Sequence, residues 1–220
     1  MAPSAPQPVA DRPRWTMRRF SALTPRVIAI GASTGGLQAL LQVLARVAPA
    51  LSNAPVVVVL HMPTGFAEVV VEQIAQATGL PTVAPRNGER LRAGHIYIAP
   101  AGQHLKALRV GDELILAYSD GPPENFCKPA VDVLFRSVAD SFGPGALALV
   151  LTGMGVDGLA GVRKIVEAGG SVIVQDEESS AVWGMPGAIA RAGLASAIAP
   201  LDRLADIIAD RLGGARRPAR

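Results

Sequence analysis

The chain has 220 residues, of which 50% are hydrophobic, 18% are charged and 4% are aromatic. This composition supports one domain with an aliphatic core, and it excludes a disordered chain, a collagen and a coiled coil. The formal net charge is +3, but eight of the 21 basic residues lie within residues 1–26 and 213–220, against a single acid. The rest of the chain is net acidic, so its charge does not indicate a nucleic-acid-binding fold.

The few cysteines and histidines limit the possible metal chemistry. Cys127 is the single cysteine, which excludes an intramolecular disulfide and a cysteine-cluster metal site, and three histidines leave little room for a dedicated metal centre. The aliphatic runs are far shorter than the roughly 18 residues of a membrane helix, and the start of the chain lacks the apolar core of a secretory signal. We therefore predict a cytoplasmic protein with no membrane insertion.

Three segments are predicted along the chain. Residues 1–25 are rich in proline and arginine without hydrophobic periodicity, which is typical of a flexible arm. Residues 26–212 carry the strand and helix patterns of one domain, and residues 213–220 form a basic tail.

Short aliphatic runs alternate with apolar residues at helical spacing in the first part of the domain. In chain order, these are a strand at Val27–Ile30, leucines at helical spacing from Leu37 to Leu44, a strand at Val56–Leu60 and a helix over Ala67–Thr78. Continuous apolar strands of this kind indicate a parallel sheet that is covered by helices on both faces.

Residues 83–117 interrupt this alternation. Their apolar stretches are short, and Gly111-Asp112 between two of them is a hairpin-turn signal. We predict an antiparallel hairpin insertion here, followed by a loop over residues 119–128.

The alternation of strands and helices then resumes. The predictions are a helix over 130–141, a strand at Ala146–Leu151, a helix over Leu159–Ala168, a strand at Ser171–Val174, a short helix near 186–191, a strand at Ala195–Ile198 and a helix over 201–212. The predicted fold class is therefore α/β: a doubly wound, mostly parallel, Rossmann-like sheet with an antiparallel hairpin insertion.

A serine, a histidine and an aspartate stand just beyond the carboxyl ends of three predicted strands. Ser33 lies in the turn Gly31–Gly36, His61 follows the second strand, and Asp157 lies in the glycine-rich turn 152–158. In a doubly wound sheet these ends share one rim, where ligands bind. The three residue types suit nucleophilic acyl transfer, because an imidazole can take the serine proton while a carboxylate fixes the tautomer of the imidazole.

The glycines around Ser33 favour a tight turn from strand to helix. Such a turn presents the hydroxyl at a helix N-terminus, where unpaired backbone N–H groups can hold an oxyanion. The chain order of serine, histidine and aspartate differs from the orders in α/β-hydrolases, chymotrypsin and subtilisin, which argues against those folds.

Simpler interpretations compete with catalysis. The glycine turn also suits a dinucleotide, but Ser33 stands where the second glycine of G-x-G-x-x-G is needed, and no acid follows the second strand. Taken singly, His61 is more typical of an ordinary loop histidine, and Asp157 is more typical of a helix N-cap residue. Only the joint placement of these two residues with Ser33 favours a catalytic interpretation.

The remaining candidates are interpreted as structural. His95 and His104 fall near the predicted hairpin and are assigned no chemistry. Cys127 has neither a motif nor an evident activating base. Met154 and Met185 lie in tight glycine and proline turns, which favours a packing role.

Seven stretches form an ordered set of longer motifs. They are Ile28–Gly36, His61–Pro63, Ile96–Pro100, Pro129–Phe135, Leu151–Gly158, Gln175–Glu177 and Trp183–Pro186. In this order, and over about residues 26–212, the sequence resembles the catalytic domain of the chemotaxis protein-glutamate methylesterases, the CheB family. Several ordered motifs are far more specific than any one glycine loop.

The resemblance implies a catalytic triad in which Ser33 is the nucleophile, His61 the general base and Asp157 the residue that orients it. It also suggests that Thr34 and Met154 shape the oxyanion pocket. The implied reaction is hydrolysis of γ-glutamyl methyl esters on the helical cytoplasmic region of methyl-accepting chemoreceptors, with release of methanol and without a cofactor or metal. Family members also deamidate receptor glutamines by the same acyl chemistry.

The sequence departs from the family pattern in ways that leave the triad unchanged. Family members usually carry an N-terminal receiver domain, whereas about 25 residues precede the first strand here, so we expect no regulation by phosphorylation of this chain itself. A separate receiver protein stays open as a regulator. Leu60, Gln73, Ala101, Lys128, Ala130 and Gly187 differ from the commonest family residues, which affects the expected substrate contacts.

Two other functions stay open from the sequence. One is a catalytically weak scaffold or binding module of a chemosensory complex, and the other is an esterase or deamidase that acts on another protein. The intact set of Ser33, His61 and Asp157 favours an enzyme over a scaffold.

Overall fold

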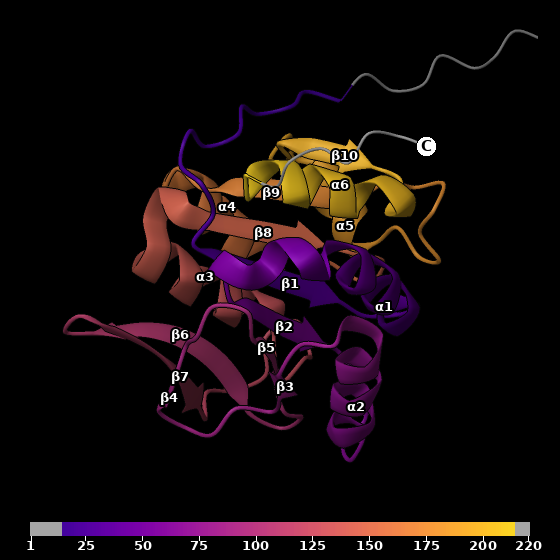
Figure 1. Cartoon of the computed structure of the whole chain (residues 1–220). Helices are drawn as coiled ribbons and strands as arrows, with labels where there is room; N and C mark the ends of the chain where they lie inside the picture. Colours follow the sequence, from indigo (N-terminus) through magenta and orange to yellow (C-terminus); the bar gives the residue numbers. More distant parts are fainter. Residues whose placement is uncertain (1–14, 214–220) are drawn as a thin grey trace, which may run out of the picture.

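A central sheet of seven strands organises the computed structural model, which describes residues 15–213 (Figure 1). Across the sheet the order is β10 (Ala197–Ala199), β9 (Ser171–Gln175), β8 (Ala146–Val150), β1 (Val27–Ala32), β2 (Val56–Leu60), β5 (Ile96–Ile98) and β3 (Thr82–Val83). Every neighbouring pair in this sheet is parallel. The predicted doubly wound, mostly parallel sheet is therefore confirmed.

Helices cover both faces of the sheet. One face carries α1 (Gly36–Val47), α2 (Ala67–Thr78) and α6 (Leu201–Arg211), and the other carries α3 (Val131–Phe142), α4 (Leu159–Glu167) and α5 (Met185–Arg191). Two 3₁₀ turns, η1 (Ala48–Asn53) and η2 (Gly143–Gly145), follow α1 and α3. Within residues 15–213, no helix combines the length and the apolar character needed to cross a bilayer.

Side-chain alternation along the strands divides the core into two clusters. In β1, Val27 and Ala29 face α3, α4 and α5, whereas Ile28 and Ile30 face α1, α2 and α6. Because helices cover both faces, every residue of β1, β2, β8 and β9 is buried. Burial on both sides is the reason why these strands are continuous aliphatic runs.

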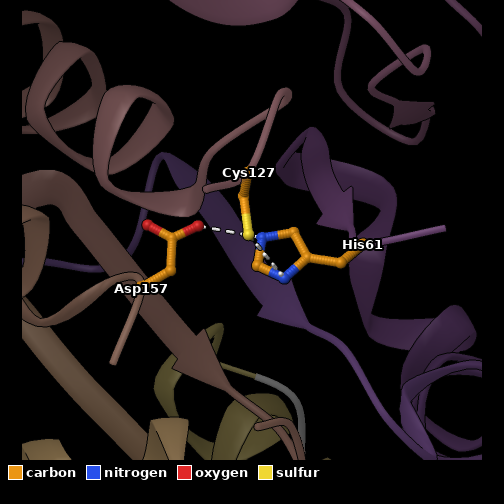
Figure 2. Close-up of side chains that lie close together, drawn as sticks. All are labelled: His61, Cys127 and Asp157. Atoms are coloured by element: carbon orange, nitrogen blue, oxygen red, sulfur yellow. Dashed lines mark hydrogen bonds and ion pairs between the residues drawn. The ribbon is translucent and has the colours of Figure 1, made fainter. Parts of the chain in front are cut away.

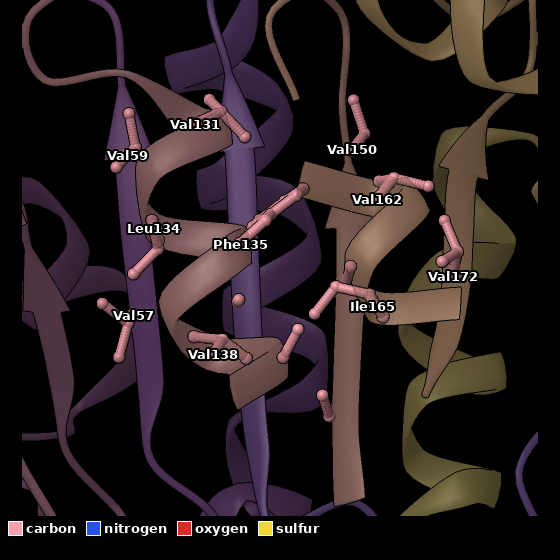
Figure 3. Packing of buried hydrophobic residues seen from close by; sticks show 14 of the residues in the cluster. Val57, Val59, Val131, Leu134, Phe135, Val138, Val150, Val162, Ile165 and Val172 are labelled. Atoms are coloured by element: carbon pink, nitrogen blue, oxygen red, sulfur yellow. The ribbon is translucent and has the colours of Figure 1, made fainter. Parts of the chain in front are cut away.

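The cluster under α3 and α4 shows how this packing is achieved (Figure 3). Leu134, Phe135 and Val138 of α3 lie over the central strands, and Val162 and Ile165 of α4 lie beside them. Full burial of such side chains contributes about 1.5–3 kcal/mol each to stability. The loops at the rim therefore lie above a well-packed core.

A smaller antiparallel sheet packs beside α3. Its strands are β4 (Glu89–Arg90), β7 (Glu113–Ser119) and β6 (His104–Val110), in that order. The β6–β7 hairpin turns at Gly111, where φ is +60° and glycine is favoured. The backbone N–H of Ala107 donates to the Ser137 hydroxyl at 3.0 Å, which joins β6 to α3. The predicted hairpin is confirmed.

The predicted extent of the insertion is wrong. Residues 83–117 were assigned to it as a whole, but Ile96–Ile98 forms β5, which pairs in parallel with β2 and β3 in the central sheet. With only three residues, all of them buried, β5 is too short to reveal its partners by periodicity.

The chain before β1 lies against the domain. Trp15 packs edge to face on Trp183 with ring centroids 5.5 Å apart, and the backbone N–H of Arg18 donates to the carbonyl of Ala195 at 2.8 Å. The flexible arm predicted for residues 1–25 therefore does not extend over these residues. The first 14 residues and the last seven, which include most of the predicted basic tail, lie outside the described residues.

The direction of chain progression reverses at β1. The chain continues from β1 to β2 on one side, whereas β8 and β9 lie on the other side. In doubly wound sheets, ligands bind beyond the carboxyl ends of the strands at this kind of switch point. The loops after β1, β2 and β8, which carry the predicted site residues, all lie there.

Candidate active site

Ser33 and His61 occupy equivalent positions beyond the ends of neighbouring strands. The last residues of β1 and β2, Ala32 and Leu60, are paired with one another. Ser33 and His61 are the residues that directly follow these two strands. The backbone N–H of His61 donates to the carbonyl of Ala32, and that of Ser33 donates to the carbonyl of Thr152, both at 3.0 Å. Ser33 is thus held between the loops that follow β2 and β8.

His61 and Asp157 are in direct contact (Figure 2). The distance between His61 Nε2 and Asp157 Oδ2 is 2.9 Å, and the side chains are 14% and 2% exposed. An ionised carboxylate can only accept a hydrogen bond, so Nε2 is the protonated ring nitrogen. The free lone pair of the imidazole is therefore on Nδ1.

Four further donors hold the Asp157 carboxylate. They are the backbone N–H groups of Val131 (2.7 Å), Asp132 (3.0 Å) and Gly158 (3.0 Å), and the side-chain amide of Asn125 (3.2 Å). Val131 and Asp132 begin α3, which has no side-chain cap of its own. The carboxylate therefore caps α3 from another loop, where the helix dipole favours a negative charge.

The surroundings set the protonation state of the two buried carboxylates. Burial alone raises the pKa of Asp157, but the hydrogen bonds from His61, Asp132 and Val131 outweigh it and hold the pKa below its ordinary value. Burial raises the pKa of Asp132, and the negative charge of Asp157 adds to this effect. Asp157 is thus the carboxylate of the pair that the site keeps ionised.

Asn125 and Asp132 belong to this network although the sequence analysis did not identify them. The Asn125 amide donates to Asp132 at 2.9 Å and to Asp157, and the backbone N–H of Gly161 donates to Asp132 at 2.7 Å. The sequence does hold a signal for Asp132, because this carboxylate lies three residues before Phe135 and therefore on the same buried face of the helix. Asn125 was not, because it lies in a loop without any periodic pattern, with φ at +50°.

A close approach of two loops positions Ser33. A Cβ atom at Gly153 would lie 2.8 Å from the Ser33 Cβ and 2.5 Å from the Met185 sulfur, so only glycine fits there. Gly35, with φ at +76°, turns the chain into α1, whose N-terminus has no side-chain cap. Its first N–H groups are thus free of side-chain partners. Within residues 15–213, the Ser33 hydroxyl makes no hydrogen bond to His61.

The two residues assigned to the oxyanion pocket by resemblance, Thr34 and Met154, are both exposed. The packing role predicted for Met154 is wrong, because 72% of this residue is exposed, whereas Met185 is fully buried as expected. The Thr152 hydroxyl donates to the carbonyl of Thr34 at 2.9 Å. This bond ties the loop after β1 to the loop after β8.

The Cys127 sulfur lies close to both the His61 ring and the Asp157 carboxylate (Figure 2). This sulfur is 3.6 Å from His61 Nδ1, and Cys127 and His61 both line a cavity of about 370 Å³. Burial, together with the charge of Asp157, raises the pKa of the thiol, which therefore stays protonated and donates to the carbonyl of Asn125 at 3.3 Å. The imidazole next to this cysteine was not evident from the sequence.

The other two histidines make contacts of a structural kind. His104 is buried, with Nε2 2.9 Å from the carbonyl of Pro122 and Nδ1 accepting the backbone N–H of Ala130 at 3.1 Å. His95 lies before β5, and its Nδ1 is 3.1 Å from the carbonyl of Ala93. These contacts agree with the structural interpretation of both residues.

Comparison with known proteins identifies similar sequences and a similar structure. The family model for CheB methylesterase matches residues 28–208. A Nitrobacter winogradskyi protein named protein-glutamate methylesterase/protein-glutamine glutaminase is 48% identical over 195 residues, which cover 89% of this chain and 46% of that protein. A Rhodospirillum rubrum protein named protein-glutamate methylesterase/protein-glutamine glutaminase 1 is 48% identical over 206 residues, covering 93% of this chain and 52% of that protein.

The crystal structure of the Thermotoga maritima CheB methylesterase catalytic domain superposes with a TM-score of 0.82 at 30% sequence identity. The match covers 86% of this chain and 99% of that domain. By contrast, the chain spans about half the length of the curated relatives it matches. The similarity is therefore to the catalytic part of those longer proteins.

Proposed function

Because the chain belongs to the CheB methylesterase family, we propose that it hydrolyses γ-glutamyl methyl esters on chemoreceptors and releases methanol. The observation that supports this most directly is the buried His61–Asp157 pair, beside Ser33 at the rim of the sheet. An acyl-transfer reaction needs these groups, and no metal or cofactor takes part in the proposed chemistry.

In the proposed first half-reaction, the Ser33 oxygen attacks the carbonyl carbon of the methyl ester. His61 Nδ1 takes the hydroxyl proton, since its other nitrogen is already bonded to Asp157. The N–H of Gly36 donates to the Ser33 carbonyl, so the following N–H groups in the first turn of α1 stabilise the oxyanion of the tetrahedral intermediate, with Thr34 and Met154 at the pocket. The imidazolium then protonates the departing oxygen, and methanol leaves an acyl-enzyme on Ser33.

The second half-reaction repeats these steps with water as the nucleophile. His61 takes a proton from water, the hydroxyl attacks the acyl carbon, and the proton passes to the Ser33 oxygen as the ester bond breaks. The product is a free glutamate side chain. Asp157 stays ionised throughout and stabilises the imidazolium in both halves, which its lowered pKa supports.

Glutamine deamidation is a second activity that the same groups support. The leaving group is then ammonia, and the acyl-enzyme is identical. The curated relatives carry this activity in their names, as protein-glutamine glutaminase. An assay for ammonia on the same receptor therefore belongs beside the methanol assay.

The surface around the site supports a protein substrate over a small ester. Phe126, Met154 and Val156 lie in the loops that carry Cys127 and Asp157, and they are 104%, 72% and 51% exposed. Apolar side chains gathered around a site are typical of a protein-binding surface. A receptor substrate with a helical cytoplasmic region locates the proposed enzyme in the cytoplasm.

The test is methanol release from a methylated chemoreceptor by the wild type and by Ser33→Ala. Loss of the nucleophile is expected to lower kcat about 10³-fold or more while the fold remains. Ser52→Ala removes an exposed serine of η1 and serves as the matched control, with kcat unchanged. Equal rates for Ser33→Ala and the wild type would refute the proposal.

A further inference from the structure

Exposed apolar side chains gather around the active site. Among residues 15–213, the large hydrophobic residues that are exposed are Met17, Leu23, Phe66, Val69, Val110, Phe126, Met154 and Val156. All but Met17, Leu23 and Val110 lie between β2 and the first turn of α2, just before α3, or between β8 and α4. These three segments also carry His61, Cys127 and Asp157, so most of the exposed apolar surface surrounds the reacting groups.

Phe126 is the most exposed of these residues and stands at the tip of a two-residue turn. The backbone N–H of Cys127 donates to the carbonyl of Glu124 at 2.8 Å, and the N–H of Glu124 donates to the carbonyl of Cys127 at 3.1 Å. Between them, Asn125 and Phe126 have φ of +50° and +63°. A type I′ turn requires positive φ at both of its central residues, and this turn directs the Phe126 side chain away from the domain.

The backbone conformation at Phe126 is unfavourable for its residue type. Positive φ is rare for a bulky side chain, and glycine, asparagine or aspartate commonly occupies this position of the turn. Phe126 gains no burial in return, because its ring is fully exposed. Strained residues of this kind cluster at functional sites, so we look for the benefit of the ring in contact with another molecule.

Contacts on both flanks hold the turn in place. The Asn125 amide donates to Asp157 at 3.2 Å, and the Arg136 guanidinium of α3 is paired with the Glu124 carboxylate at 2.5 Å. The ring is therefore presented before a partner arrives. A preorganised apolar contact of this kind loses little conformational entropy on binding.

The ring also lies beside the general base. Cys127, the next residue along the chain, has its sulfur 3.6 Å from His61 Nδ1. His61, Met62, Pro63 and Phe126 are among the residues that line the cavity of about 370 Å³. Because the Phe126 ring is fully exposed, it stands at the mouth of this cavity.

An amphipathic helix offers a partner of the matching shape. Side chains three or four positions apart lie next to one another on a helix, with about 5–6 Å between their Cβ atoms. When a glutamyl ester of such a helix lies at Ser33, the side chain one turn away lies beside it. An aromatic ring next to the general base can then pack on that side chain if it is apolar.

We propose that Phe126 determines specificity for a helical protein substrate, by packing on an apolar side chain one helical turn from the methylated glutamate. This inference rests on the proposed function and adds what the substrate must carry beside the ester. A small methyl ester has no such side chain. Phe126 therefore acts on the affinity for the protein substrate and not on the chemical step.

The first test is methanol release from a methylated chemoreceptor by Phe126→Ala. We expect KM to rise at least about tenfold with kcat unchanged, because only binding of the substrate is weakened. Phe126→Tyr keeps the ring and is expected to keep KM within about twofold. Val110→Ala removes an exposed apolar side chain at the turn of the β6–β7 hairpin and is the matched control, with KM unchanged.

The second test uses a small substrate, the γ-methyl ester of N-acetylglutamate amide. Phe126→Ala and the wild type should hydrolyse this ester with the same kcat/KM. A parallel loss on the small ester and on the receptor would show that Phe126 only supports the structure of the site, and it would overturn the proposal. Equal KM values of Phe126→Ala and the wild type on the receptor would overturn it as well.

Binding without turnover separates this proposal from the proposed function. In a Ser33→Ala background, Phe126→Ala should bind the methylated receptor at least about tenfold more weakly in a calorimeter. If no variant releases methanol, the proposed function fails, and this binding comparison still decides whether Phe126 contacts the receptor. A wild-type dimer that Phe126→Ala dissociates in analytical ultracentrifugation would assign the ring to a second copy of the chain and overturn the proposal.

Discussion

The two sides of the His61 ring differ in how firmly the protein holds them. On one side, Asp157 is 2% exposed and its carboxylate accepts five hydrogen bonds, from His61, Asn125, Val131, Asp132 and Gly158. Toward the solvent, Thr34 and Met154 are exposed, and Ser33 is half-buried. The buried side fixes the base before any substrate arrives, and the open side leaves room for the substrate.

The comparison has an energetic consequence. Hydrogen bonds to a buried charge are costly to break, because the remaining partner stays unsatisfied. Substitutions on the buried side should therefore affect both the free energy of unfolding and kcat. Substitutions on the open side should affect the reaction with little effect on stability.

Asp157→Asn is the strongest way to break the buried side. The amide carries no negative charge to stabilise the imidazolium, and it can turn an N–H donor toward the imidazole. We therefore expect kcat to fall about 10⁴-fold. Methanol release measured against Asp140→Asn, an exposed aspartate of α3, checks this. A kcat within tenfold of the wild type would show that Asp157 does not orient the base.

The same variant carries a pH signature in stability. The pKa of Asp157 is lowered in the folded state, so its charge stabilises the fold above the ordinary aspartate pKa of about 3.9, and this contribution is lost as pH falls through the folded-state value. The difference in free energy of unfolding between the wild type and Asp157→Asn should therefore be larger at pH 7 than at about pH 3. Urea unfolding at both values measures it, and an equal difference at both would contradict the lowered pKa.

Asn125→Gly sharpens the comparison by removing one donor to the buried Asp157 carboxylate, although Asn125 is itself an exposed residue. The amide bridges Asp132 and Asp157, and glycine accepts the φ of +50° without strain. Loss of hydrogen bonds to charged groups is expected to cost about 2 kcal/mol of stability, and kcat should fall roughly tenfold with KM unchanged.

The neighbouring Phe126→Gly is the matched control for stability. Its backbone has a similar φ of +63°, but its side chain is fully exposed. Urea unfolding should show no loss for Phe126→Gly and a clear loss for Asn125→Gly. A raised KM with an unchanged kcat in Asn125→Gly would place this residue with the substrate contacts and not with the base.

What the sequence could predict follows the same division. The continuous aliphatic runs located β1, β2 and β8, and the rim rule then placed Ser33, His61 and Asp157 on neighbouring loops. These inferences need only periodicity and topology. The two-residue strands β3 and β4 escape them, because so few residues cannot show a period.

Apart from Asp132 on α3, the site residues that the sequence did not reveal lie in the loop of residues 120–130. This loop brings Asn125 and Cys127 to His61 and Asp157, but its path depends on contacts with α3 and on left-handed backbone conformations at two non-glycine residues. Such a path has no local sequence signal. The exposure of Met154 was missed for a similar reason, since a methionine in a glycine turn can equally well pack in the core or lie on the surface.

Met154→Ala tests the open side and has the smallest expected effect. With 72% of the residue exposed, its truncation should change the free energy of unfolding by less than about 0.5 kcal/mol. Its proposed place at the pocket and at the protein-binding surface predicts a few-fold loss in kcat/KM for methanol release from a receptor. Met185→Ala provides the contrast, because that buried side chain should cost about 2–5 kcal/mol. A large loss of stability in Met154→Ala would remove the distinction between the two sides of the ring.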